Sequence, residues 1–95
     1  MLSIVVDQAG DVVYLHADSA GLEALEQAVS SLRQRVAEGD CEDSHLFTPA
    51  WGGAELTESM LPQEQSGGCR QVHHLKLHGW TQEWAHKHGL SKDAP

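Results

Sequence analysis

The chain is poor in the residues on which disulfide frameworks, membrane insertion and nucleic-acid binding usually depend. Its 95 residues include only two cysteines, six Lys or Arg, and 5% aromatic residues. No apolar run approaches the ~18 residues of a membrane-spanning helix. The start, MLSIVVDQAGD, lacks the basic segment and small-residue cleavage site of a signal peptide. We therefore expect a small cytoplasmic protein with no membrane partner, in which Cys41 and Cys69 are free thiols.

Basic residues are scarce, and they are unevenly distributed. The formal net charge is −8. Residues 1–69 hold twelve Asp or Glu against two Arg, whereas residues 70–95 hold four Lys or Arg against two acids. Such an acidic body disfavours nucleic acid as a partner, because phosphate binding needs clustered Lys and Arg. The same field would speed association with a basic protein, although acidity also serves solubility alone.

Two patterns near the N-terminus predict regular structure. The β-branched runs LSIVVD and DVVYLHA, separated by QAG, predict a hairpin with Gly10 in its turn. The next segment spaces its apolar residues by three and four, which predicts a helix over about 19–38. Asp18 or Ser19 would cap this helix, and Gly39 would end it. Its apolar stripe comprises Leu22, Leu25, Val29, Leu32 and Val36.

The remaining sequence predicts three more strands. We expect strands at 44–48, at 54–60 after a WGG turn, and at 70–80 after a polar loop over 62–68. The order β-β-α-β-β-β indicates an α+β fold with two layers. One long helix would pack on one face of a mostly antiparallel sheet of four or five strands. Residues 1–80 would form a single domain, and residues 81–95 an extension that is partly helical and then frayed.

The stretch CRQVHHLKLHGW (69–80) raises the question of a metal site. Cys69, His73, His74 and His78 supply suitable ligand types, but their spacing matches no closed zinc motif. On a strand only His74 and His78 share a face, roughly 13 Å apart at ~3.3 Å per residue. We therefore predict no metal. A small metal- or histidine-dependent enzyme using these four residues remains the alternative.

Catalytic signatures are also missing. No GxSxG elbow and no cysteine-protease signature surrounds the Ser, Cys and His residues of the chain. Paired carboxylates occur, but on exposed strands and loops such pairs are more often solvated charges. We therefore predict no catalytic residue and a protein that is not an enzyme.

One loop tryptophan suggests a binding surface instead. Trp51 lies in PAWGGAE, where neighbouring glycines cannot bury it. A tryptophan in such a loop either fills the core or anchors an interface. With acidic residues around it, Trp51 would suit a basic protein partner. The predicted partner-binding residues are Trp51, Glu55, Glu58, Glu42, Asp43, His74, His78 and Trp80.

Three segments together resemble the immunity protein 32 family of bacterial polymorphic toxin systems. They are the helix beginning DSAGLEALEQAVSSLRQ, the following DSHLFTPAWGGAELTE, and the strand VHHLKLHGW. The resemblance covers most of residues 11–80. Its motifs are Gly21-Leu22 at the helix start, His45-Leu46 before an apolar strand, and the segment 52–56, GGAEL.

The resemblance implies a function. It implies a cytoplasmic antitoxin without enzymatic activity or cofactor, which binds the toxin domain of an Rhs, contact-dependent or type VI secretion effector and occludes its active site. The toxin's own chemistry and the oligomeric state of this chain stay open. A structural dimerisation domain, pairing through a bare sheet edge or face, is a further alternative.

Overall fold

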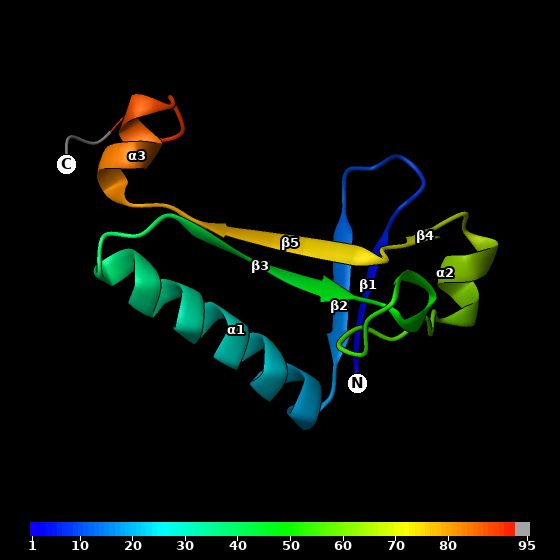
Figure 1. Cartoon of the computed structure of the whole chain (residues 1–95). Coiled ribbons are helices and arrows are strands. Elements are labelled where there is room, and N and C mark those ends of the chain that lie inside the picture. The colour runs from blue at the N-terminus through cyan, green and yellow to red at the C-terminus, as the bar shows by residue number, and fades with distance from the viewer. Residues whose placement is uncertain (93–95) are drawn as a thin grey trace. The chain divides into compact units, whose positions relative to one another are not determined.

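The computed structural model describes residues 1–92, which form an α+β fold with five strands (Figure 1). The elements in chain order are β1 (Leu2–Val6), β2 (Val13–Ala17), α1 (Ser19–Ala37), β3 (Glu42–Phe47), the 3-10 turn η1 (Pro49–Trp51), α2 (Pro62–Ser66), β4 (Arg70–Gln71), β5 (His74–Gly79) and α3 (Gln82–Lys87). The predicted class and strand order are confirmed. The antiparallel strands form two sheets, of order β2-β1-β4 and β3-β5, each smaller than the single sheet of four or five strands that we expected.

The chain gathers into two compact units, each made of two segments. Unit 1 comprises residues 1–25 and 45–75, and unit 2 comprises residues 26–44 and 76–95. The elements α1, β3 and β5 run from one unit into the other. The division into a domain over 1–80 and an extension over 81–95 stays a prediction, and the frayed end expected at 93–95 lies outside the described residues.

Unit 1 is built on the predicted hairpin. β1 and β2 pair antiparallel from Leu2↔Ala17 to Val6↔Val13. Gly10 adopts φ 80° in the turn and donates its N–H to the Asp7 carbonyl, a conformation that glycine adopts without steric cost. β4 pairs with the other edge of β1, so β1 is central and β2 is an edge strand. Among residues 1–92, the buried apolar side chains all belong to this unit: Leu2, Ile4, Val5, Leu46 and Leu56.

Three local expectations were wrong. Residues 54–60 do not form a strand, and the segment expected as a polar loop over 62–68 contains α2. Pro62 at the start of that helix and Glu64 two residues later are the N-terminal pattern of a capped helix. The long last strand is divided into β4 and β5, because the Val72 N–H bonds the Ile4 carbonyl while the His73 carbonyl accepts from Thr48.

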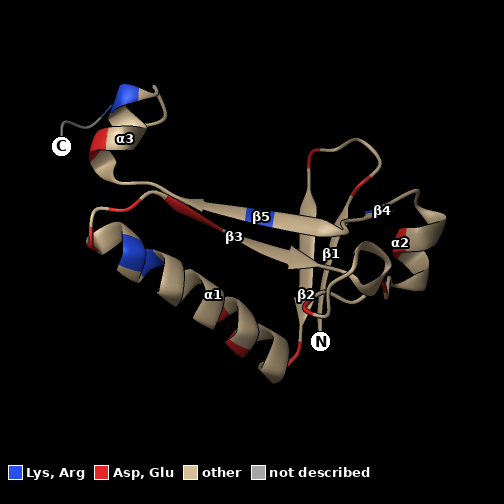
Figure 2. Cartoon of the chain, in the orientation of Figure 1, with Lys and Arg blue, Asp and Glu red and all other residues tan. Residues whose placement is uncertain are grey.

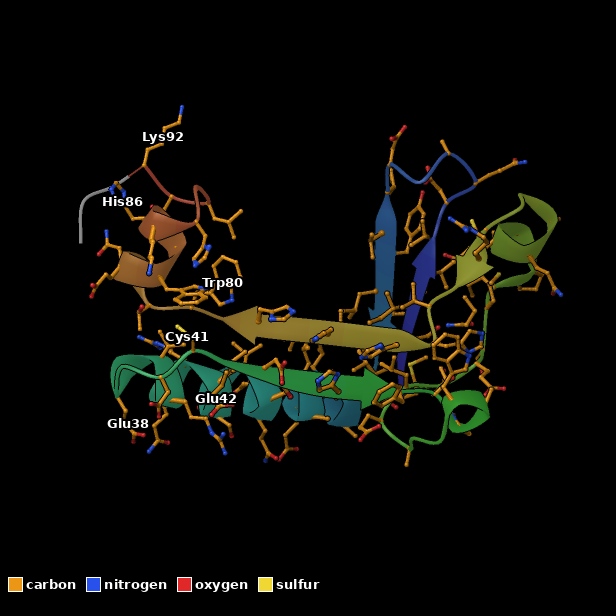
Figure 3. All side chains as sticks on the ribbon, turned by 45° about the horizontal axis from the view of Figure 1, so that its top comes forward. Glu38, Cys41, Glu42, Trp80, His86 and Lys92 are labelled. Atoms are coloured by element: carbon orange, nitrogen blue, oxygen red, sulfur yellow. The ribbon has the colours of Figure 1, made fainter. Side chains whose placement is uncertain are left out.

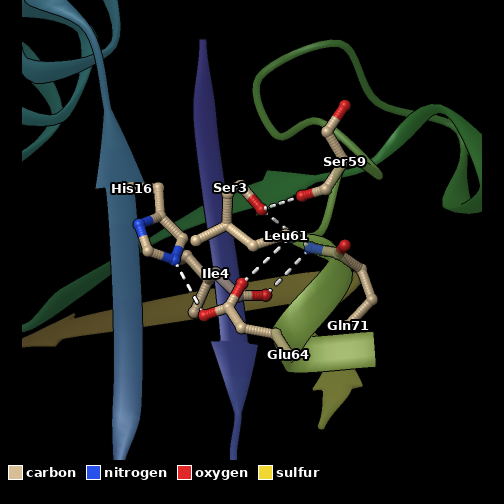
Figure 4. A network of polar contacts seen from close by, with 7 residues as sticks. All are labelled: Ser3, Ile4, His16, Ser59, Leu61, Glu64 and Gln71. Atoms are coloured by element: carbon tan, nitrogen blue, oxygen red, sulfur yellow. Dashed lines mark hydrogen bonds and ion pairs between the residues drawn. The ribbon is translucent and has the colours of Figure 1, made fainter. Parts of the chain in front are cut away.

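A buried polar network joins the elements of unit 1 (Figure 4). Glu64 is only 8% exposed, and its Oε2 lies 2.9 Å from His16 Nε2 on β2. Its other oxygen accepts the Leu61 N–H at 3.2 Å. On β1, the buried Ser3 hydroxyl donates to the Ser59 carbonyl at 2.6 Å and accepts from Gln71 Nε2 at 3.2 Å. The network therefore fixes α2, the preceding loop and the short β4 on the hairpin.

Unit 2 contains the C-terminal part of α1, which packs against the end of β5. A Cβ on Gly79 would lie 2.7 Å from Leu32 Cγ and 2.8 Å from Val36 Cγ2, so only glycine permits this close approach. The helix ends as expected near Gly39, which adopts φ 92°. Among residues 1–92, no helix combines the length and apolar character needed to cross a membrane.

The Glu64 contact predicts a pH dependence of stability. The hydrogen bond from His16 lowers the pKa of the Glu64 carboxyl below its ordinary value of 4.5; burial opposes this shift, and the Leu61 N–H adds to it. A group whose pKa falls on folding stabilises the fold above its unfolded pKa, and that contribution disappears as the pH falls through the folded pKa. Glu64→Gln should therefore destabilise the protein above about pH 4.5, with the difference from wild type shrinking at lower pH.

Chemical denaturation from about pH 5.5 down to about pH 3 measures this difference. The matched control is Glu23→Gln on the exposed part of α1, for which we expect little change at any pH in this range. A Glu64→Gln difference that stayed constant with pH would show that the carboxylate charge does not contribute.

Candidate functional site

The structure separates the eight predicted partner-binding residues into two groups. Trp51, Glu55, Glu58 and His74 belong to unit 1, whereas Glu42, Asp43, His78 and Trp80 belong to unit 2. The first group lies on or beside a turn over residues 47–58, which we call the Trp51 turn. The second group lines one hollow together with Cys41 and Trp84, which we call the Trp80 hollow.

The Trp51 turn presents its tryptophan outward on a fixed backbone. Trp51 is 60% exposed, and its ring lies parallel to that of His73, with 5.6 Å between the ring centroids. His73 Nδ1 in turn lies 2.7 Å from the hydroxyl of the fully buried Thr48. The carbonyl of Thr48 accepts the N–H groups of Trp51 and Gly53 at 3.0 and 2.9 Å. Trp51 is therefore an exposed apolar side chain that is oriented by the fold.

The two predicted glutamates of this turn have a structural role. Glu55 Oε2 accepts the N–H groups of Phe47 at 3.2 Å and of Ala54 at 3.1 Å. These contacts, with that of Phe47 the largest, lower the pKa of the Glu55 carboxyl. Glu58 Oε1 accepts the Ala50 N–H at 2.6 Å. Both carboxylates thus hold the loop that carries Trp51, in addition to contributing negative charge.

A second aromatic group of unit 1 lies where β3 and β5 pair. The His74 ring stacks on Phe47 with 4.2 Å between centroids, and on His45 with 5.0 Å. His45 Nδ1 and His74 Nε2 lie 2.8 Å apart. One ring must donate this hydrogen bond and the other must accept it, so the accepting ring is neutral. His74 therefore packs between strands, and only part of its ring is exposed.

The Trp80 hollow has a volume of about 300 Å³. It is lined by Cys41, Glu42 and Asp43 from one segment, by His78 and Trp80 at the end of β5, and by Trp84 from α3. Figure 3 shows Trp80 directly after β5, beside Cys41. The Thr81 hydroxyl caps α3 by accepting the Trp84 N–H at 3.1 Å, and it lies 3.9 Å from the Cys41 sulfur. These contacts place Trp84 next to the strand ends.

Residues that the sequence reasoning missed complete both surfaces. Cys41 and Trp84 line the hollow, and His88 packs 4.1 Å from the Trp84 ring. Trp80, Trp84 and His88 are spaced four residues apart, and this spacing places side chains on one face of a helix. The sequence would have indicated this aromatic face if the predicted C-terminal helix had included Trp80. In unit 1, His73 and Thr48 are the missed residues, and no local pattern signals their pairing across 25 positions.

The histidine-rich stretch shows no metal-binding geometry. Within residues 1–92, no three or more His, Cys, Asp or Glu side chains are grouped so that they would hold a metal ion. Cys41 and Cys69 are free thiols, as expected. The four residues of the metal or histidine enzyme alternative are divided: Cys69, His73 and His74 lie in unit 1, and His78 lies in unit 2. The assignment of the chain as a non-enzyme without a cofactor stays a prediction.

The contacts of Glu55 predict how the Trp51 turn responds to mutation. Glu55→Ala removes the acceptor of two backbone N–H groups, each worth roughly 1 kcal/mol. We expect hydrogen exchange at the Phe47 and Ala54 amides to accelerate about fivefold. Glu58→Ala is the matched control, because it should accelerate exchange at Ala50 instead. Unchanged exchange at Phe47 and Ala54 in Glu55→Ala would contradict the role assigned to this carboxylate.

Comparison with known proteins identifies no relative. The chain matches no protein-family model, no curated protein and no solved structure. The resemblance to the immunity protein 32 family therefore stays a prediction.

Proposed function

We propose that the chain is a binding protein for a basic surface of another protein, and that Trp51 is its anchor. The observation that carries this proposal is an indole that is 60% exposed and is nevertheless held in one orientation by His73 and by the turn beneath it. Tryptophan is enriched among the few residues that dominate binding energy at interfaces. An exposed tryptophan held by the fold loses little conformational freedom on binding.

The charge of unit 1 indicates the character of the partner. This unit has a single basic residue, Arg70, against seven acids: Asp7, Asp11, Asp18, Glu23, Glu55, Glu58 and Glu64. Its formal charge is therefore −6 out of a total of −8. In Figure 2 most of the blue segments lie on unit 2, namely on the C-terminal part of α1, on β5 and on α3. A partner that meets Trp51 would gain most from a positively charged face.

Toxin neutralisation is the form of this function that the sequence resemblance favours. The chain would act in the cytoplasm of the cell that produces the toxin, bind the toxin domain of an Rhs, contact-dependent or type VI effector, and occlude its active site. Toxins that act on anionic substrates have basic clefts, and an acidic protein that places an indole in such a cleft would block it. No catalytic group of this chain takes part.

Removal of the indole provides the direct test. Trp51→Ala should weaken binding to the cognate toxin domain by about 2 kcal/mol, roughly 30-fold in Kd. The fold should be retained, since Trp51 fills no part of the core. Calorimetric titration measures the affinity, circular dichroism checks the fold, and survival of cells expressing the toxin domain reports neutralisation.

Leu90→Ala is the control for Trp51→Ala, because Leu90 is an apolar residue in the other unit that is even more exposed (71%). We expect it to leave the affinity unchanged. Full protection and wild-type affinity in Trp51→Ala would refute the position of the interface. No binding by the wild-type chain would refute the proposed partner.

A second candidate function, self-association, is favoured by the edge strand β2. β2 is an edge of the three-stranded sheet, and it exposes Val13 (63%) together with Val12, Tyr14 and Leu15 beside it. Strand edges with exposed apolar residues and no lysine or proline are prone to pair with another copy. The charge of −6 on the same unit opposes this association, which is why we rank it second.

Light scattering distinguishes the two candidates. If β2 pairs with β2 of a second copy, the free chain should be a dimer, and Val13→Lys should make it a monomer. Added salt should strengthen the dimer by screening the repulsion between the acidic units. A wild-type chain that remains monomeric at high concentration and high salt would exclude the second candidate.

A further inference from the structure

The Trp80 hollow has walls of two kinds. The rings of Trp80 and Trp84 are nearly perpendicular, with an angle of 86° between planes and 6.2 Å between centroids. The lining also includes His78 and the consecutive residues Cys41, Glu42 and Asp43. Aromatic faces attract cations through their quadrupoles, and carboxylates attract them by charge. A hollow that combines two indoles with two carboxylates has the composition of an organic-cation site.

Each carboxylate of the hollow has a basic neighbour within the chain. Glu42 Oε1 lies 3.5 Å from Arg35 Nη1, and Asp43 Oδ2 lies 3.7 Å from Lys76 Nζ. All four side chains are more than two-fifths exposed, and exposed ion pairs at such distances contribute little. A cation that is partly desolvated between indoles would interact with these carboxylates more strongly than the two surface residues do.

The Trp84 ring also contacts a cation within the chain. The Lys87 ammonium lies 6.0 Å from the centroid of this ring, within the range of a cation–π contact. Neither Lys87 nor His88 lines the hollow. His88 packs on both indoles of the hollow, with ring centroids 6.1 Å from Trp80 and 4.1 Å from Trp84.

An apolar hollow of about 310 Å³ adjoins the first one. Its walls include Val29, Leu32 and Val36 of α1 and Leu77 of β5, with Arg33 as the one charged residue of the lining. It shares His78 and Trp80 with the Trp80 hollow. Two adjoining recesses, one acidic and aromatic and the other apolar, match a peptide segment that carries a basic side chain beside an aliphatic one.

We propose that the Trp80 hollow binds the guanidinium group of an arginine from the partner protein, and that a neighbouring aliphatic side chain of the same segment enters the apolar hollow. Arginine fits better than lysine because its planar guanidinium stacks on an indole while its N–H groups form paired hydrogen bonds with carboxylates. This inference rests on the proposed function, which it extends by naming a second contact point and the chemistry that it recognises.

The test uses tryptophan fluorescence, because the hollow contains two of the three tryptophans in the chain. A Trp51→Phe background removes the third, so that emission reports Trp80 and Trp84 alone. The probe is the capped tripeptide Leu-Arg-Leu, with Leu-citrulline-Leu as its uncharged isostere and Leu-Lys-Leu as the point-charge comparison. We expect saturable quenching by the arginine peptide, with at least fivefold weaker binding of the citrulline peptide and intermediate binding of the lysine peptide.

Two variants locate the effect. Glu42→Gln combined with Asp43→Asn keeps the shape of the wall and should weaken binding of the arginine peptide about tenfold. Trp84→Leu should do the same, and since Trp84 is 39% exposed the fold should survive, as circular dichroism will verify. Glu83→Gln on α3, which does not line the hollow, is the charge control. Equal binding of the arginine and citrulline peptides, or wild-type binding by both hollow variants, would falsify the proposal.

Failure of this inference and failure of the proposed function can be told apart. The peptide titration needs no toxin, so it reports the chemistry of the hollow alone. If toxin binding depends on Trp51 but the peptides do not bind, the function stands and the hollow is not an arginine site. If the arginine peptide binds while no toxin domain does, the hollow is a cation site in a protein whose partner lies elsewhere.

Discussion

The fold of unit 1 depends on one buried carboxylate. Glu64 lies in the short helix α2 and meets His16 of β2 and the Leu61 N–H, so a single side chain connects the edge strand with a helix 48 positions later. A buried carboxylate without such partners would be strongly unfavourable. The contact therefore selects one arrangement of α2 on the hairpin. The hydrogen bonds of Ser3 and Gln71 then secure β4, whose two-residue ladder would not be stable alone.

Other carboxylates of the chain, like that of Glu64, also accept hydrogen bonds that hold the backbone in place. Several acids accept backbone N–H groups close by: Asp7 those of Asp11 and Val12, Asp18 that of Gly21, Glu55 and Glu58 those of the Trp51 turn. Each carboxylate orders a turn or a helix end and leaves its charge at the surface. The negative field of unit 1 and the shape of its loops thus come from the same residues, so charge reversal at Glu55 or Glu58 would alter both.

Local sequence patterns predicted the individual helices and strands of the N-terminal half well. They did not predict the contacts between segments that are distant in the sequence. The hairpin and α1 were expected at nearly their observed bounds, because alternation and the helical period are local signals. The strand expected over 54–60 fails because Glu55 and Glu58 reach back to the turn instead of extending the chain. Trp51, Glu42 and Asp43 were identified from their local sequence. Cys41 and Trp84 join the Trp80 hollow only through the pairing of β3 with β5 and the cap of α3.

The histidine-rich stretch contributes side chains to both the Trp51 turn and the Trp80 hollow. His73 supports Trp51, and His74 stacks between strands in the same unit, while His78 lines the Trp80 hollow in the other. His73 lies in the break between β4 and β5, whereas His74 is the first residue of β5. His73 stacks on Trp51, and His74 stacks on Phe47. The cluster in the sequence therefore separates in space, and each ring becomes an aromatic packing group. Two of these rings lie against tryptophans, His73 against Trp51 and His78 against Trp80, so the stretch helps to orient an indole in each unit.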